Sequence, residues 1–281
     1  LVLLAAFAAA GELTSLAEAH LYADDIVHAE STPYQRIVVT RWKDDLRLHL
    51  NNNLQFSSRD EYRYHEALVH PGLATLPGAR RVLVLGGGDG LAVREILKYP
   101  QVESVTLVDL DPAMTRLFST APALTALNEG ALSSPKVTVV NADALVWLEE
   151  NRERFDFVVV DFPDPSNFAI GKLYSAAFYR LLDKHLSEIG LAVVQSTSPL
   201  YARQSFWCVV TTIESTGLVA TPYHALVPSF GEWGYVLVGR RAHVPPSAYP
   251  VDTRFLAPAM TPALFEFPKD MARVPAEVNQ L

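Results

Sequence analysis

Short apolar runs alternate with amphipathic stretches between residues 82 and 194. From Arg81 onward, five runs rich in β-branched residues are separated by stretches with helical periodicity; they cover residues 82–85, 105–108, 137–140, 157–160 and 191–194. Continuous apolar strands that alternate with amphipathic helices are typical of a parallel sheet that is covered on both faces. The pattern therefore predicts an α/β fold with a doubly wound sheet.

A different pattern precedes this region. Residues 34–40 and 46–50 alternate apolar and polar positions on either side of a polar turn at residues 43–45, which predicts a β-hairpin in a small β domain. Ser58 and Glu61 have the spacing of a capping box, so we expect a helix to begin here and to end at Pro71 and Gly72.

These patterns divide the chain into three parts: an apolar or helical segment over residues 1–24, the small β domain with its connecting helix over residues 25–78, and the Rossmann-like domain over residues 79–281. Seven prolines after Val244 predict an irregular tail in the last part. Residues 1–10 are almost wholly apolar but reach only about half the length of a bilayer crossing. They fit either the end of a membrane helix or a short packing helix.

The composition of the chain limits which molecules it is expected to bind and which compartment suits it. The formal net charge of the 281 residues is -8, and Lys and Arg are not clustered along the sequence, which argues against nucleic-acid binding. The single cysteine, Cys208, excludes an internal disulfide and suits a reducing compartment such as the cytoplasm.

Acidic side chains follow each of the first four predicted strands of the sheet, and Gln195 follows the fifth. The acids are Asp89, Asp109, Asp143 and Asp161. Because ligands of open parallel sheets bind at the carboxyl ends of the strands, these side chains are expected to line one cleft. Carboxylates that converge raise each other's pKa, and a bound cation offsets that cost, so the cleft is predicted to select cations.

Each acid also has a simpler interpretation. Asp89 and Asp143 each precede a predicted helix and could serve only as caps. Asp109 ends the second strand about twenty residues after the glycine-rich turn at residues 86–90, a position suited to ribose hydroxyls. Asp161 and Asp164 flank Phe162 and Pro163 in a loop that is held out of a helix, or they form an ordinary Asp-Pro turn.

Asp89 also limits the choice of nucleoside. The turn and the helix that follows favour an anion such as the carboxylate of S-adenosylmethionine, which a further carboxylate would oppose. Asp89 instead attracts a nucleoside that has lost its carboxylate and ends in an ammonium group.

At this point the chain resembles the spermidine synthase family over most of its length. The matching segments are Tyr34-Gln35, Asp60-Glu61-Tyr62, Tyr64-His65-Glu66, residues 86–90, Arg94-Glu95, Asp109-Leu110-Asp111, Asp143 and residues 161–165. The resemblance implies a class I methyltransferase-like sheet with a small N-terminal β domain, and homodimers or homotetramers. It also implies a polyamine aminopropyltransferase that uses decarboxylated S-adenosylmethionine as co-substrate, without a metal or a prosthetic group, and putrescine as the favoured acceptor.

The resemblance further implies roles for individual residues. It assigns the nucleoside to Gln35, Gly86, Gly88, Asp89, Asp109, Asp143 and Ala144. It assigns the polyamine to His65, Asp89, Asp161, Asp164 and Gln195, with Asp161 as the proton acceptor and Tyr64 beside it in the polyamine channel. Gln195 is expected to accept a hydrogen bond from the attacking nitrogen.

Three departures from the family pattern affect acceptor preference. Phe162-Pro163 replaces a small hydroxyl pair, Phe168 stands where a proline is common, and residues 228–234 replace a loop that often holds an acceptor-binding tyrosine. These features resemble a bacterial branch in which the domain follows membrane helices, which would place it at the cytoplasmic face of the membrane. His65, Glu66 and His70 suggest a zinc helix, but the two histidines are five residues apart rather than four.

Two other functions remain open from the sequence. A methyltransferase on the same fold would bind intact S-adenosylmethionine, and a non-catalytic sensor would bind a polyamine or nucleoside without turnover. Asp89 argues against the first, and the presence of both Asp161 and Asp164 argues against the second. The identity of the acceptor amine and the oligomeric state are not determined by the sequence.

Overall fold

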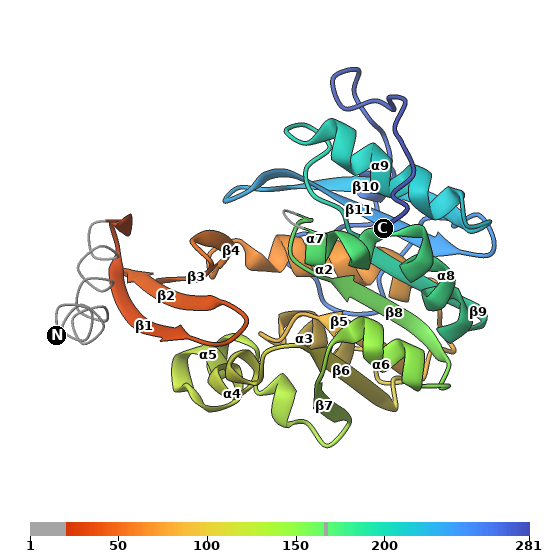
Figure 1. The fold of residues 1–281 in the computed structure, drawn as a ribbon. Helices are drawn as coiled ribbons and strands as arrows, with labels where there is room; N and C mark the ends of the chain where they lie inside the picture. The colour runs from red at the N-terminus through yellow and green to blue at the C-terminus, as the bar shows by residue number, and fades with distance from the viewer. Residues whose placement is uncertain (1–20, 166–167) are drawn as a thin grey trace, which may run out of the picture. The chain divides into compact units, whose positions relative to one another are not determined.

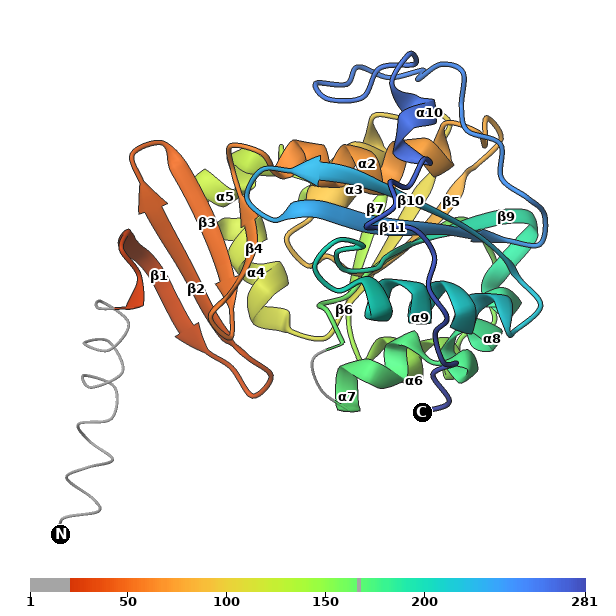
Figure 2. The same cartoon turned by 90° about the horizontal axis from the view of Figure 1, so that it is seen from above.

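The computed structural model describes residues 21–165 and 168–281, and the chain forms two compact units, Leu1–Glu61 and Tyr62–Leu281. Figure 1 and Figure 2 label the elements of both units. Residues 1–20, which make up most of the predicted N-terminal segment, lie outside the described residues. In the described ranges, we find no helix with the length and apolar character that a bilayer crossing requires.

The first unit contains a four-stranded antiparallel sheet. Its strands are β1 (Asp25–Ser31), β2 (Arg36–Trp42), β3 (Asp45–Leu50) and β4 (Asn53–Ser57), in the order β1-β2-β3-β4. The turn between β3 and β4 places Asn51 at φ 49° and Asn52 at φ 68°, left-handed conformations that asparagine tolerates well. The predicted hairpin and small β domain are confirmed.

Ser58 does not cap the connecting helix, contrary to the capping-box prediction. Its hydroxyl accepts a hydrogen bond from the backbone N–H of Leu46 at 2.9 Å and donates one to Asp45 at 3.2 Å. Asp45 is buried and also accepts from Ser57 at 2.7 Å and from Arg47 at 2.7 Å. The serine is therefore used to satisfy a buried carboxylate, for which a missing hydrogen-bond partner would be costly.

The second unit is built on a seven-stranded sheet in the order β10-β11-β9-β8-β5-β6-β7. Five strands are parallel: β5 (Arg81–Gly86), β6 (Ser104–Asp109), β7 (Val137–Asn141), β8 (Phe155–Asp161) and β9 (Leu186–Gln195). All five apolar runs predicted as strands are among them, so the α/β fold class is confirmed. The chain fills one side of β5 first and then crosses to the other side at β8. Gly86 and Asp161 pair in register at this switch point.

Two further strands were not predicted. β10 (Val219–Val227) and β11 (Gly231–Gly239) form an antiparallel hairpin that joins the sheet against β9. Residues 231–234, which the sequence analysis treated as a loop, therefore begin a strand. Pro222 lies within β10, where it is tolerated because β10 is an edge strand.

Helices cover both faces of this sheet (Figure 2). α6 (Ala144–Glu150), α8 (Ala176–His185) and α9 (Arg203–Glu214) share one apolar cluster with alternate residues of β5, β8 and β9. α2 (Glu61–Leu73) packs on the opposite face, where a Cβ on Gly72 would lie 2.7 Å from Phe157. The remaining helices are α3 (Leu91–Leu97), α4 (Pro112–Thr120), α5 (Pro122–Leu127), α7 (Phe168–Gly171), α10 (Thr261–Leu264) and the 3-10 turns η1 (Ala131–Ser133) and η2 (Lys172–Tyr174).

Nearly all of α2 belongs to the second unit, whereas the sequence analysis placed the boundary after this helix, between residues 78 and 79. The close fit of Gly72 against the sheet explains the difference. The helix also continues through Pro71, where the sequence predicted its end. Proline leaves the carbonyl oxygen of Ala67 without its helical donor, and the hydroxyl of Tyr223 in β10 donates to that oxygen at 2.7 Å.

We predict that Tyr223→Phe destabilises the protein by about 1–3 kcal/mol, because it leaves the buried carbonyl oxygen of Ala67 without a donor. Urea unfolding measures this change. Tyr179→Phe is the matched control, because the Tyr179 hydroxyl is buried with no hydrogen-bond partner. An equal loss of stability in both variants would contradict this account of Pro71.

Candidate functional site

The glycine-rich turn brings the ends of three strands into contact. A Cβ on Gly86 would lie 2.3 Å from the backbone oxygen of Asp161, and a Cβ on Gly88 would lie 2.7 Å from the carboxyl carbon of Asp109. Gly86 also has φ 80°, a conformation that favours glycine. Glycine at both positions therefore lets the turn after β5 approach the acids at the ends of β6 and β8.

Asp161 forms the central contact of the site. The hydroxyl of Tyr64, which projects from α2, donates to its carboxylate at 2.5 Å. Burial raises the pKa of Asp161 to about 6, and the charge of Asp89 adds to the increase, whereas His65 and the Tyr64 hydrogen bond oppose it. Burial and the nearby Asp161 charge raise the pKa of Tyr64 well above its ordinary value, so Tyr64 remains a hydrogen-bond donor. The sequence-predicted pair is thus brought together.

His65 and Asp89 lie near this pair. His65 is buried and its ring meets Tyr64 edge-on with 5.0 Å between the centroids. Asp89 accepts a hydrogen bond from the N–H of Leu91 at 2.9 Å, at the start of α3. Its charge acts on the pKa values of both Asp161 and Asp109, so Asp89 supports the helix start and contributes to an acidic cluster.

Asp109 is fixed by two backbone N–H groups. One carboxylate oxygen accepts from Gly88 at 3.0 Å and the other from Asp111 at 2.9 Å. Burial raises the pKa of Asp109 to about 6, although these two hydrogen bonds lower it. Each oxygen keeps a second lone pair, so the carboxylate can accept further hydrogen bonds from a ligand's hydroxyl groups.

Asp164 is held by residues that the sequence did not indicate. The Thr197 hydroxyl donates to one carboxylate oxygen at 2.9 Å, and Gln195 donates to the other at 3.4 Å. Burial raises the pKa of Asp164, and both of these hydrogen bonds lower it. Thr197 has φ 57°, a strained conformation for a β-branched residue. No local sequence signal identifies a threonine that must adopt it.

Gln195 uses both ends of its side chain within the protein. Its amide nitrogen donates to the backbone oxygen of Phe162 and to the Tyr174 hydroxyl, the latter at 2.9 Å. Its amide oxygen accepts from the N–H of Thr197 and the indole N–H of Trp233, both at 3.2 Å. This geometry differs from the expectation that Gln195 accepts a hydrogen bond from the amine, because both lone pairs of the oxygen are already used. Gln195 instead orients the loop that holds Asp164.

An aromatic group surrounds Tyr64. Phe230, Trp233 and Tyr235 have ring centroids 6.3, 6.4 and 5.6 Å from that of Tyr64. Phe230 and Trp233 come from the segment for which the sequence analysis assigned no role. They meet Tyr64 because β10 and β11 form a hairpin that was not predicted, so no sequence signal indicated this contact.

Asp143, Ala144 and Gln35 are the remaining predicted residues. Asp143 accepts from the N–H groups of Leu145 and Val146 and caps α6, with Ala144 buried behind it. β7, which precedes it, is three strands from β8, or about 14 Å at the usual strand spacing. Gln35 belongs to the first unit, where its backbone bonds to Thr32. The nucleoside roles of Asp143, Ala144 and Gln35 remain predictions.

The residues of the rejected zinc motif have different partners. Glu66 is buried and accepts from the backbone N–H groups of residues 254, 255 and 256 at 2.6, 2.9 and 3.0 Å. His70 bonds to Tyr99 and Glu95 at 3.0 and 2.9 Å. Within the described residues, no group of three potential metal ligands is found. Glu66 thus fixes the tail against the helix that carries Tyr64.

Comparison with known proteins places this geometry in a family. The model of the spermine/spermidine synthase domain matches residues 61–246, which include Tyr64, Asp161, Asp164 and Gln195. The chain belongs to the spermine/spermidine synthase family. The fold is similar to that of a spermidine synthase from Thermotoga maritima. The two structures match with a TM-score of 0.79 and 21% identity, over 88% of this chain and 87% of that one. A spermidine synthase in complex with the transition-state analogue AdoDATO gives the same TM-score at 22% identity, over 88% of each chain.

Curated members of the family are more similar in sequence. Polyamine aminopropyltransferase 2 of Ralstonia nicotianae is 63% identical over 99% of this chain and 55% of its own length. The polyamine aminopropyltransferase of Leptospira interrogans is 54% identical over 100% of this chain and 56% of its own length. The chain therefore spans about half the length of the curated relatives it matches.

The raised pKa of Asp161 predicts a pH-dependent stability effect. A folded pKa of about 6 above the ordinary 3.8 stabilises the fold only at low pH, and this contribution is lost as the pH rises through 6. We expect Asp161→Asn to stabilise the protein by about 3 kcal/mol at pH 7.5 and by only about 1 kcal/mol at pH 4.5. Urea unfolding at the two pH values measures the difference.

Asp156, at the start of the same strand, is the matched control. Although partial burial raises its pKa, hydrogen bonds from the N–H groups of Arg80 and Arg81 lower it below the ordinary value. Asp156→Asn should therefore destabilise the protein at pH 7.5. A change of the same sign in both variants would contradict the proposed electrostatics.

Proposed function

We propose that the chain is the catalytic part of a polyamine aminopropyltransferase of the spermidine synthase type. The observation that carries this proposal is the partly buried Asp161 carboxylate, hydrogen-bonded to Tyr64 at the switch point of the sheet. The names of its curated relatives, all polyamine aminopropyltransferases, support the same activity.

The reaction needs a group that accepts a proton. An aliphatic amine with a pKa near 10 arrives as an ammonium ion and must lose a proton before its nitrogen can attack. Asp161 accepts that proton while Tyr64 holds the carboxylate in place. The nitrogen lone pair forms a bond to the aminopropyl carbon, the carbon–sulfur bond breaks, and its electrons neutralise the sulfonium as methylthioadenosine leaves.

Electrostatics favour cationic reactants at this site. Burial and the charge of Asp89 disfavour the ionised form of Asp161 in the protein alone. A bound ammonium or sulfonium group favours the ionised form and offsets this cost. The pair of Asp161 and Asp164 can hold the amine, while Asp109 can hold the ribose. Asp89 favours a nucleoside without a carboxylate, so decarboxylated S-adenosylmethionine is the proposed co-substrate, with no prosthetic group.

Several finer features stay predictions. Putrescine is the favoured acceptor, because two acids separated by Phe162 and Pro163 suit a diamine. A homodimer or homotetramer, a cytoplasmic location and a tether to the membrane follow from the family resemblance alone.

A direct assay tests the activity. The protein is incubated with decarboxylated S-adenosylmethionine and, in separate reactions, putrescine, cadaverine, agmatine and spermidine, and release of methylthioadenosine is followed. Turnover with at least one amine is expected. Transfer of a methyl group from intact S-adenosylmethionine, or binding of the amines without turnover, would overturn the proposal.

We predict that Asp161→Asn lowers kcat about 10²–10⁴-fold, the usual contribution of a general base. Binding of the nucleoside, measured by calorimetry, should change little because Asp109 is intact. Asp156→Asn serves as the control and should retain turnover. Loss of nucleoside binding in Asp161→Asn would instead indicate damage to the fold of the site.

The rate should also depend on pH. At saturating nucleoside, kcat/KM for the amine is expected to fall on the acidic side of pH 6, because Asp161 must be ionised to accept a proton and the bound sulfonium lowers the pKa that burial raises to about 6. Tyr64→Phe removes a hydrogen bond that lowers the pKa of Asp161, so the acidic limb should move to higher pH. An unchanged limb in Tyr64→Phe would contradict the role of Asp161 as the group that titrates.

A further inference from the structure

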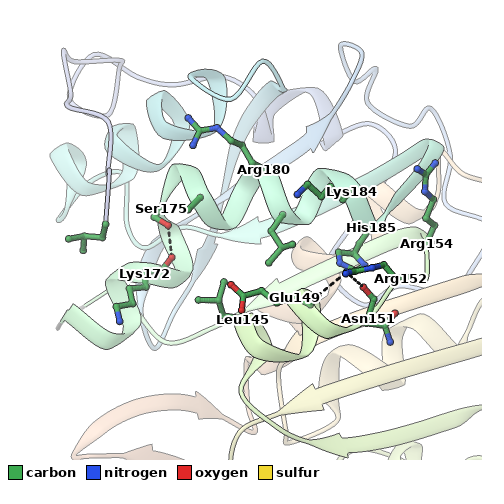
Figure 3. Close-up of a pocket in the computed structure, with 13 residues that line it drawn as sticks. Leu145, Glu149, Asn151, Arg152, Arg154, Lys172, Ser175, Arg180, Lys184 and His185 are labelled. Carbon is green, nitrogen blue, oxygen red and sulfur yellow. Dashed lines mark hydrogen bonds between the residues drawn. The ribbon is translucent and has the colours of Figure 1, made fainter.

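A concave surface lies between α6 and α8 (Figure 3). It is a pocket of about 830 Å³, within the size range of small-molecule sites. Leu145 and Glu149 face it from α6, and Ala177 and Leu181 face it from α8. The spacing of four residues in each pair puts both members on one side of their helix.

The pocket gathers positive charge. It is lined by Arg152, Arg154, Lys172, Arg180 and Lys184, with Glu149 as its carboxylate. Within the described ranges, none of these five cations forms an ion pair. The chain as a whole carries a net charge of -8, so this local excess is opposite in sign to the rest of the protein.

Parts of the pocket wall are held in position without a ligand. The Arg152 guanidinium donates to the backbone oxygens of Glu149 and Asn151 at 2.8 and 3.0 Å (Figure 3). The Lys172 ammonium lies 5.0 Å from the ring centroid of Phe168. His185 is buried with its two ring nitrogens each 2.8 Å from a backbone oxygen. Such fixed positions reduce the entropy that binding would cost.

The pocket is separate from the acidic site. Arg154 precedes the first residue of β8 and Asp161 is the last, so the strand places about 20 Å between them. A cationic polyamine would be repelled by the five cations, and the pocket is therefore not a second site for the proposed acceptor.

We propose that this pocket binds a small polyanion that carries two or more phosphate groups on an apolar body, such as a nucleoside triphosphate. Arginine and lysine side chains bind phosphate oxygens through charge-assisted hydrogen bonds. Leu145, Ala177 and Leu181 supply an apolar surface for the body of the ligand. The concave shape favours a compact ligand over the flat surface of a membrane.

Calorimetry with the full chain tests the proposal, with ATP, tripolyphosphate and adenosine as probes. ATP is expected to bind more tightly than tripolyphosphate, because it also covers the apolar surface, and any adenosine binding should not depend on Arg180 and Lys184, since the proposed nucleoside site lies elsewhere. Binding should weaken when the salt concentration rises from about 20 to about 200 mM, since the exposed charges are screened.

Arg180→Ala/Lys184→Ala should weaken ATP binding at least about tenfold, the effect of losing one or more charge-assisted hydrogen bonds. Both side chains are exposed on α8, and alanine is a strong helix former, so the fold should persist. Arg241→Ala/Lys269→Ala removes the same charge from exposed positions elsewhere and should leave binding unchanged. Release of methylthioadenosine without ATP should be equal in both double variants, which keeps this test independent of the proposed activity.

Three outcomes would overturn the proposal. One is the absence of ATP binding at low salt. Another is an equal loss of affinity in the two double variants, which would indicate attraction without a defined site. The third is binding to phosphatidylserine vesicles that depends on Arg180 and Lys184 while ATP does not bind, which would assign the surface to a membrane.

Discussion

The contact between the ends of β5 and β8 is the constraint on which the site depends. Gly86 pairs with Asp161 in register, and a side chain at position 86 would overlap the Asp161 backbone. The turn after β5 can therefore pack against the end of β8 and partly bury the carboxylate. Burial then raises the pKa of Asp161, and the hydroxyl of Tyr64 fixes its orientation. The properties that suit Asp161 to the proposed role of proton acceptor thus result from strand packing.

The two ends of β8 illustrate how position decides the behaviour of the same residue type. Asp156 at the start of the strand accepts hydrogen bonds from two backbone N–H groups, which lower its pKa despite partial burial. Asp161 at the end accepts a hydrogen bond from the Tyr64 hydroxyl and lies near Asp89, so burial dominates and its pKa rises. Asp156 stabilises the fold as a carboxylate, whereas ionised Asp161 destabilises it, a cost in stability that fits the proposed catalytic role.

Local pattern predicted the parts of the fold that depend on neighbouring residues. Apolar runs, and the glycine and polar residues between them, predicted the five parallel strands, the turn at residues 86–90 and the acids at the strand ends. Local pattern did not predict three other features, because each depends on segments far apart in sequence. These are the β10–β11 hairpin, the strained conformation of Thr197 and the hydrogen bond from Trp233 to Gln195. Pro71 gave a wrong helix end for the same reason, since its missing donor is supplied by Tyr223 from another element.

The direction in which the strands run also explains why the distribution of charge over the folded chain could not be predicted from composition. In a parallel sheet, all strand ends of one kind meet at one edge, so acids that follow successive strands collect there. The cations of the pocket between α6 and α8 come from the segment that joins α6 to β8, from η2 and from one side of α8, which adjoin only in the folded chain. The net charge of -8 is a sum over the whole chain, so it does not show that one region is acidic and the other basic. The sign that a ligand meets is therefore set by topology, and each region has to be judged by its own side chains.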